Sequence, residues 1–244
     1  MTGGSPTGNA QENTKLISWL LEADEPWTRY RTLVDLLERP EDEAGVQAAR
    51  AEMLRHPQVQ ALIGSASTWG KDPLKRHSDA GHPIYSFSTL ADFGVRADDD
   101  GMSETIDAVL AHQAPEGALQ TRVNIPTRFG GSGEDEWSWM ACDAPTLLYC
   151  LLAFGLGGDP RVQNSLEHLV NLVDENGWRC VAAPELGRFR GPGRKEDPCP
   201  VANVYALKAL AQVPDLLDSP ATRTGAEMLL DHWAYQGDRK MYLF

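Results

Sequence analysis

The chain has 244 residues, of which 42% are hydrophobic and 23% are charged, proportions that are typical of a globular protein. No uninterrupted apolar stretch approaches the roughly 20 residues that a membrane helix needs, so no membrane-spanning segment is expected. The net charge of −13 would repel a nucleic acid, which argues against DNA or RNA as a partner.

The N-terminal residues come first in chain order and are rich in Gly, Ser, Thr, Asn and Gln. This composition predicts a disordered tail over residues 1–13, followed by a single domain over residues 14–244. The tail has neither the basic start nor the apolar run of a signal peptide. We therefore expect a cytoplasmic protein whose four cysteines are thiols or metal ligands rather than disulfides.

A repeat of about 60 residues organises the rest of the chain. Glycine turns occur at Gly117, Gly177 and Gly237, at spacings of 60 residues, and each follows an amphipathic helical stretch. The segment LADFGV at residues 90–95 recurs as LLAFGL at residues 151–156. Equal spacing with matching flanking sequence indicates a structural repeat.

Each repeat is predicted to be a pair of helices. In the copy over residues 144–178, the first helix is apolar on most sides, which indicates burial within a bundle. The second helix begins at Asp159-Pro160, a capping acceptor followed by a proline, and Ser219-Pro220 opens the matching helix of the next copy. A fainter copy follows Trp27, and strand-like alternation occurs nowhere at useful length. The sequence therefore predicts an all-α protein of about four helical pairs.

Helical pairs that close on a Gly-Trp loop resemble the α/α toroid of terpenoid cyclases and protein prenyltransferase β subunits. The resemblance rests on GGSGEDEWSWMACDAP at residues 130–145, NGWRC at residues 176–180 and GRFRGPGRKEDPCP at residues 187–200. These segments are similar to a bacterial group described as prenyltransferase-like or squalene-cyclase-like. From about Trp27 onward, the resemblance implies an α/α toroid-like, partial ring of about four helical hairpins, where a full toroid has six pairs.

Two motifs of the related enzymes are missing from the chain. Class II cyclases protonate an alkene with an Asp-x-Asp-Asp acid, and the acidic runs Asp98–Asp100 and Glu134–Glu136 have a different form. The Asp-Asp-x-x-Asp magnesium motif of ionisation-type synthases does not occur either. The resemblance therefore implies the fold more strongly than it implies the reaction.

Cysteine and histidine residues precede successive inner helices of the expected ring. Cys142 and Cys199 come just before two equivalent helices, and Cys180 follows the Gly-Trp loop. One repeat earlier, His77 and His82 come before the corresponding helix. Thiolates and imidazole suit tetrahedral zinc, and helix N-termini favour the thiolate form. The pattern predicts a zinc site, with the alternative that these cysteines are small buried hydrophobic residues.

The fourth zinc ligand is left open between His82, His77 and water. Protein prenyltransferases hold zinc with an Asp, a Cys and a His, so the resemblance makes Asp143, beside Cys142, a candidate catalytic residue. Cys150 lies inside an apolar helix and is expected to belong to the core.

A basic cluster lies directly before Cys199. Its members are Arg188, Arg190, Arg194 and Lys195. Arginine side chains grip phosphate or carboxylate groups with two parallel hydrogen bonds, so this loop is a candidate substrate-binding segment for an anionic substrate. The alternative is a solvated loop whose charges pair with Glu196 and Asp197.

An acidic and aromatic segment supplies further candidates. Glu134, Asp135 and Glu136 could act as general acids, as paired carboxylates do in glycosidases, but such a run is more often an exposed turn. Trp137 and Trp139 could line a cavity for an apolar or isoprenoid chain, although packing is the expected role for at least one of them.

Three functions follow from these candidates. The first is a prenyltransferase- or terpene-cyclase-like enzyme with a Cys-ligated zinc and a small anionic or isoprenoid substrate. The second is a non-catalytic helical-repeat binding module whose zinc is structural, and the third is a carbohydrate-processing enzyme that uses Glu134–Glu136. Neither the substrate nor the oligomeric state follows from the sequence.

Overall fold

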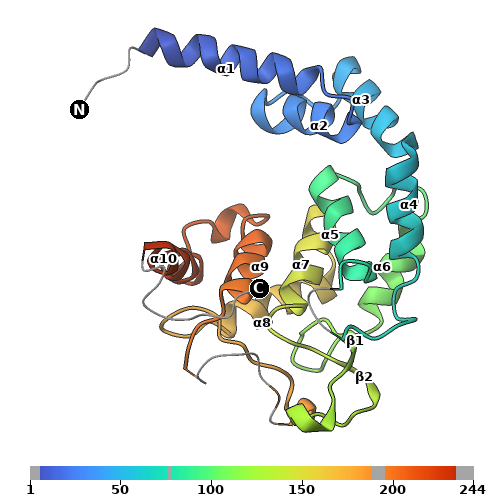
Figure 1. The fold of residues 1–244 in the computed structure, drawn as a ribbon, viewed down its shortest axis with the longest axis vertical. Coiled ribbons are helices and arrows are strands. Elements are labelled where there is room, and N and C mark those ends of the chain that lie inside the picture. The colour runs from blue at the N-terminus through green and yellow to red at the C-terminus, as the bar shows by residue number, and fades with distance from the viewer. Residues whose placement is uncertain (1–5, 76–78, 188, 190–195, 235–244) are drawn as a thin grey trace.

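A computed structural model of the chain describes residues 6–75, 79–187, 189 and 196–234. Within these residues the protein is mostly helical, with ten α-helices and one small two-stranded sheet. The helices follow a curved path that has α1 at one end and α10 at the other (Figure 1). None of the described helices is both long and apolar enough to cross a bilayer. The expected all-α class is thus confirmed in its coarse form.

The first part of the curve contains short helices. They are α1 (Pro6–Leu21), α2 (Pro26–Arg31), the π-helical turn η1 (Thr32–Leu36), α3 (Ala44–Arg55) and α4 (Pro57–Ala66). Because α1 begins at Pro6, it overlaps the tail predicted to be disordered over residues 1–13. The helix contains the mostly apolar segment from Leu16 to Leu21 and extends from it toward the N-terminus through polar residues, which are compatible with helical structure.

Three helical pairs make up the rest of the array. They are α5 (Pro83–Phe93) with α6 (Ser103–Leu110), α7 (Ala144–Ala153) with α8 (Pro160–Asn171), and α9 (Pro200–Leu210) with α10 (Pro220–Ala234). Helices α5, α7 and α9 pack in a row, and they line the concave side of the curve (Figure 1). The 60-residue repeat therefore corresponds to real helical pairs in the described part of the chain.

The two helices of a pair differ as their sequences predict. In α7 every residue from Ala144 to Leu151 is buried, as expected for a helix with neighbours on several sides. In α8 a single stripe is buried, including Val162, Leu166 and Leu169. The predicted cap is present, since Asp159 Oδ1 accepts the Arg161 N–H at 2.8 Å just before α8.

The glycine turns join one pair to the next. Gly117 and Gly177 have φ angles of 105° and 101°, which favour glycine. A Cβ atom at Gly117 would lie 2.6 Å from the Asn164 carbonyl oxygen, and one at Gly177 would lie 2.5 Å from Asn203 Oδ1. Each turn thus needs glycine for its backbone conformation and for close approach to the following helical pair. The third glycine of the repeat, Gly237, lies outside the described residues.

A β-hairpin was not expected. Strand β1 (Thr121–Asn124) pairs antiparallel with β2 (Asp135–Ser138), with Arg122 opposite Trp137. The sequence shows no strand-like alternation of useful length over these residues. Each strand has only four residues, which is too short for an alternating pattern to be recognised in the sequence.

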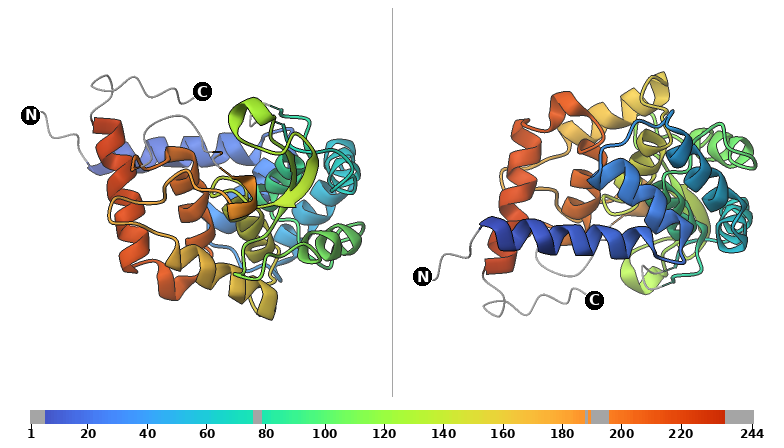
Figure 2. Two further views of the ribbon diagram at one scale, coloured as in Figure 1. Left: turned by 90° about the horizontal axis from the view of Figure 1, so that it is seen from below. Right: turned by 90° about the horizontal axis from the view of Figure 1, so that it is seen from above.

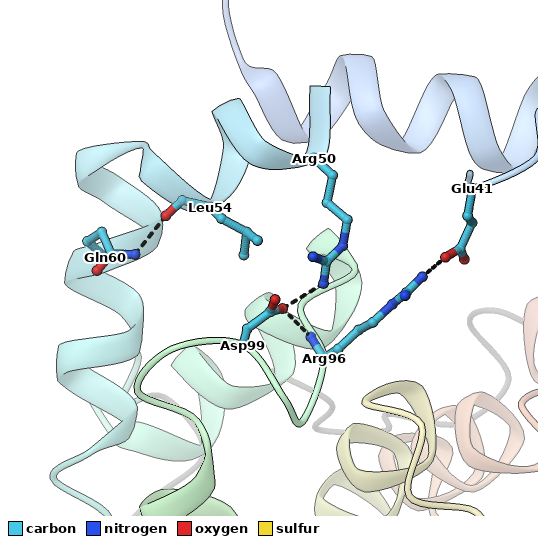
Figure 3. Close-up of polar contacts among 6 residues, drawn as sticks. All are labelled: Glu41, Arg50, Leu54, Gln60, Arg96 and Asp99. Atoms are coloured by element: carbon cyan, nitrogen blue, oxygen red, sulfur yellow. Dashed lines mark hydrogen bonds and ion pairs between the residues drawn. The ribbon is translucent and has the colours of Figure 1, made fainter. Parts of the chain in front are cut away.

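A network of ion pairs and hydrogen bonds links the first part of the curve to the helical pairs that follow (Figure 3). Asp99, in the loop after α5, accepts hydrogen bonds at 2.7 Å from the Arg50 side chain on α3 and from the Arg96 backbone N–H. Arg96 also forms an ion pair with Glu41. Asp99, the middle residue of the acidic run Asp98–Asp100, thus has a structural role.

Candidate functional site

Two isolated backbone bridges bring the three candidate cysteines together. Met140 pairs with Ala182 and Arg179 pairs with Pro198, both in the antiparallel sense. The segments 139–142, 178–183 and 198–199 consequently lie side by side. Because Cys142, Cys180 and Cys199 each lie within one or two residues of a bridge, the bridges bring the backbone segments that carry them together.

Hydrogen bonds on both sides of the central segment hold this arrangement. The Ala141 N–H donates to the Val181 carbonyl at 2.9 Å, and the Cys199 N–H donates to the Trp178 carbonyl at 2.8 Å. Cys142 comes two residues before α7 begins at Ala144, and Cys199 is the N-cap residue of α9. Two cysteines therefore lie at the positive ends of helix dipoles, which stabilise negative charge.

The neighbouring groups act on the Cys142 thiol. Burial raises the pKa of the Cys142 thiol well above its ordinary value, and the charges of Asp143, Cys180 and Cys199 raise this pKa further. A hydrogen bond with the Asp143 side chain acts in the same direction. Cys142 is buried, whereas Cys180 and Cys199 are half-buried. The Cys142 thiol would therefore lose its proton near neutral pH only if a nearby positive charge stabilised the thiolate.

The predicted zinc ligands, the cysteines included, are not arranged as a metal site in the described part of the chain. Among these residues, no three His, Cys, Asp or Glu side chains form a group that could hold a metal ion. His82 caps α5 instead: its Nδ1 accepts the Ile84 N–H at 3.3 Å, and its ring also hydrogen-bonds to the Asp72 backbone. Burial lowers the pKa of His82. With both ring nitrogens engaged, His82 fits a structural role, while His77 lies outside the described residues.

Two tyrosines that the sequence analysis did not select flank the cysteine site. Tyr85 on α5 and Tyr205 on α9 are both half-buried on helices of the inner row. Burial raises the pKa of each phenol, and the charges of Asp143 and Cys142 raise both further. Both side chains therefore stay protonated near neutral pH and can donate hydrogen bonds beside the thiols.

A second polar cluster lies on the same three helices. The Tyr149 hydroxyl on α7 donates to Asp92 on α5, and Lys208 on α9 donates to both Asp92 oxygens at 2.9 and 3.2 Å. The Lys208 ammonium also lies 4.2 Å from the centre of the Tyr149 ring. Because α9 rises about 1.5 Å per residue, Lys208 is roughly 13 Å along the helix from Cys199. Spacings of seven residues, from Tyr85 to Asp92 and from Cys142 to Tyr149, could have revealed these shared faces.

The acidic run forms part of the hairpin. Asp135 accepts a hydrogen bond from Asn124 Nδ2 at 2.8 Å and forms an ion pair with Arg122 at 3.2 Å. Glu136 accepts from Ser132 Oγ at 2.7 Å, and Glu134 is exposed next to the turn. These contacts favour a structural role for the carboxylates over sugar hydrolysis. The basic candidates Arg188, Arg190, Arg194 and Lys195 lie outside the described residues.

Trp137 and Trp139 each pair with a histidine. The Trp137 ring stacks on His112 with a centroid distance of 3.5 Å and an interplanar angle of 8°. Trp139 Nε1 donates to Glu116 at 2.6 Å, and its ring meets His168 edge-on at 5.0 Å. Trp139 also lines a small cavity between α7 and α8. Packing is thus the role that these contacts support for both tryptophans.

In comparisons with known proteins, no family model and no curated protein matches this chain. The assignment to a family consequently depends on the resemblance of the short motifs.

Proposed function

We propose that this protein is a zinc-dependent enzyme on an α/α toroid-like scaffold, related to prenyltransferases and terpene cyclases, with Cys142, Cys180 and Cys199 as zinc ligands. The observation that carries the proposal is the pair of backbone bridges that brings these three cysteines together from separate segments. Nothing in the packing of three helical pairs requires three thiols at one point, whereas zinc binding does.

The chemistry of the site suits a soft divalent cation. A buried thiol beside other thiols and a carboxylate resists ionisation, and a zinc ion would reverse this because it binds the thiolate form. The N-termini of α7 and α9 add partial positive charge. As placed, no three His, Cys, Asp or Glu side chains of the described residues form a metal-binding group, so rotation of the half-buried Cys180 and Cys199 would accompany binding. Asp143 is the carboxylate best placed to support Cys142.

The enzymatic part of the proposal rests on two neighbouring tyrosines. Tyr85 and Tyr205 lie on α5 and α9, which line the concave side of the helical array (Figure 1). Both phenols are close enough to Asp143 and Cys142 to feel their charge, so they could hold a small substrate by hydrogen bonds. The substrate that we propose is a small anionic or isoprenoid molecule, for which the loop from Arg188 to Lys195 supplies positive charge. A bound zinc would act there as a Lewis acid or activate a thiol or water.

A structural zinc is the second candidate. Cys142 is only 4% exposed, and it belongs to a small apolar cluster with Met140 and Leu186. Such burial is typical of a closed metal shell that stabilises a fold, whereas a catalytic zinc keeps one position open. In that case the protein would be a non-catalytic binding module.

Metal analysis of the purified protein tests both versions. We expect about one zinc per chain, with loss of the metal in Cys142→Ser, Cys180→Ser and Cys199→Ser. Cys150→Ser is the matched control, because Cys150 is buried in the middle of α7 away from the bridges. A wild type that stays free of zinc in zinc-supplemented buffer would contradict the proposal.

Cobalt substitution then separates the two candidates. If the metal keeps an open position, an added small thiol enters the shell and changes the visible absorption of the Co²⁺ protein. If the shell is closed, the spectrum stays unchanged and the melting temperature falls when the metal is removed with a chelator.

A further inference from the structure

The helices at the two ends of the array expose large apolar side chains. On α1, Leu16 and Trp19 are 53% and 68% exposed. On α10, Leu230 and Trp233 are 67% and 75% exposed. Both pairs have the form Leu-x-x-Trp, so each forms a short apolar ridge along one side of its helix.

On α10 this ridge faces away from the rest of the molecule. Gly225 and Met228 are buried, and Gly225 lies against the Trp178 ring beside α9. At about 100° of rotation per residue, Leu230 lies on the opposite side of the helix from Gly225, and Trp233 lies next to it. The helix is therefore apolar on two sides, and only one of these sides packs against the rest of the molecule.

The same holds for α1. This helix packs against α2 and η1, and Ile17, Leu20 and Leu21 on one of its sides are half-buried. Leu16 and Trp19 lie toward the other side. A helix that is apolar on two sides is typical of the interior of a repeat array, whereas the terminal helices of such arrays usually have polar outer faces.

Charges next to the two ridges are complementary. Lys15 precedes Leu16 on α1, whereas Glu227 and Asp231 flank Leu230 on α10. Contact between α1 and α10 would bring the lysine close to the carboxylates. Because α1 and α10 lie at opposite ends of the curved array (Figures 1 and 2), one chain contains both halves of a self-complementary interface.

From these observations we infer that two copies of this chain associate about a two-fold axis, with α1 of each copy packed on α10 of the other. A two-fold arrangement satisfies both ridges at once, because the contact between α1 of one copy and α10 of the other occurs twice in the dimer. The two curved arrays then close into a single ring, with both cysteine sites on the same continuous assembly. This inference does not depend on zinc binding.

The molecular mass in solution tests the inference. By light scattering after size exclusion at about 50 μM, we expect twice the chain mass of 26.8 kDa for the wild type. Trp19→Glu and Trp233→Lys should each be monomeric, with unchanged helical content by circular dichroism. Phe129→Glu is the matched control and should stay dimeric, because Phe129 is 57% exposed but lies in the hairpin loop.

A mixing experiment identifies which helices meet. When Trp19→Glu and Trp233→Lys are mixed in equal amounts, a mixed dimer has one intact contact between Trp19 and Trp233. Its other contact places the two introduced, opposite charges together, so dimers should reappear. A monomeric wild type would overturn the inference, as would variants that stay dimeric. If the mixture stays monomeric, the interface is not the one inferred here. Zinc content is measured separately, so either proposal can fail without the other.

Discussion

The buried side chain of Asn203 on α9 holds the backbone of Trp178 in the Gly-Trp loop. Asn203 Nδ2 donates to the Trp178 carbonyl at 2.8 Å, and Asn203 Oδ1 accepts the Trp178 N–H at 3.1 Å. The same Nδ2 donates to the Cys199 carbonyl at 2.8 Å. One amide thus joins the loop before Cys180 to the N-terminus of α9, and it positions two of the three proposed zinc ligands.

Asn203→Ala should therefore destabilise the protein by about 2–4 kcal/mol, since it leaves buried backbone groups without their partners. Urea unfolding at pH 7 measures this loss. Asn171→Ala is the control, because Asn171 is exposed at the end of α8, and it should change stability by no more than about 0.5 kcal/mol. Equal effects of the two substitutions would show that the Asn203 contacts carry little stability.

Gly225 lets α10 approach the Trp178 ring. A Cβ atom there would lie 2.6 Å from Trp178 Cζ3, and Trp178 is fully buried, so Gly225→Ala must push the two elements apart. We expect a loss of about 1–3 kcal/mol, as for other overpacked sites. Gly64→Ala in α4 is the matched control, because nothing lies within 4 Å of its added Cβ. That variant should gain about 0.5–1 kcal/mol through helix propensity, and a thermal melt distinguishes the two signs.

Asp99 should differ from its two acidic neighbours. Although burial opposes the charged form of Arg50, hydrogen bonding and charge interaction with Asp99 raise the pKa of the guanidinium. Asp99→Ala removes this pairing and the acceptor of the Arg96 N–H, for an expected cost of about 1–3 kcal/mol. Asp98→Ala and Asp100→Ala alter exposed side chains and should have little effect. A similar loss in all three variants would assign the effect to net charge instead.

Stability should fall in mild acid because of His112 and His168, which are half-buried, and His82, whose pKa burial also lowers. Burial lowers the pKa of His112 and His168 below 6.5, and in His168 a weaker opposing effect comes from Glu116. In mild acid the unfolded chain therefore binds more protons than the folded protein, because its imidazoles have the higher pKa. The free energy of unfolding is at its full value above pH 6.5, and it falls as the pH drops through 6.5 toward the folded pKa values.

Urea unfolding of His168→Gln between pH 7 and pH 5.5 tests this pH dependence. The decrease in stability over that range should be smaller than in the wild type, because one of the three imidazoles with a lowered pKa is gone. His232→Gln, near the end of α10, controls for the replacement of a histidine. An identical decrease in wild type and His168→Gln would contradict the prediction.

The polar cluster on the concave side should show energetic coupling across three helices. Tyr149→Phe removes the donor to Asp92 from a nearly buried position, which should cost about 1–2 kcal/mol. Lys208→Met should cost less than about 1 kcal/mol, because Lys208 and Asp92 are 32% and 48% exposed. A double-mutant cycle should give a coupling energy of about 0.5 kcal/mol or more. Additive losses would show that the three residues act separately.

Much of the fold could be predicted because its signals are local. The apolar stripe of α8, its Asp159 cap and the glycines at 117 and 177 are each specified within a few residues of sequence. The hairpin could not be predicted, since its strands depend on pairing between β1 and β2 rather than on a pattern within either. Helix α1 also extends farther than composition indicated, because helical structure continues from its apolar end into the polar residues before it.

The candidate site was only partly accessible from the sequence. The position of Cys142 and Cys199 before equivalent helices indicated that they share one end of the array, and the bridges bring them and Cys180 together. The role of His82 as a helix cap depends on the Ile84 N–H and the Asp72 backbone, which no spacing reveals. The zinc itself stays a prediction for metal analysis to test.

By itself, the sequence determined the period of the helical pairs, the caps that begin the helices and the glycines that end the turns. These features depend on the backbone preferences of neighbouring residues. Only the tertiary structure decided that Trp178 is held by Asn203, that Asp92, Tyr149 and Lys208 form one cluster, and that α1 and α10 present unpaired apolar ridges. Such relationships join residues far apart in the chain, and they are set by how the helices pack rather than by any local preference.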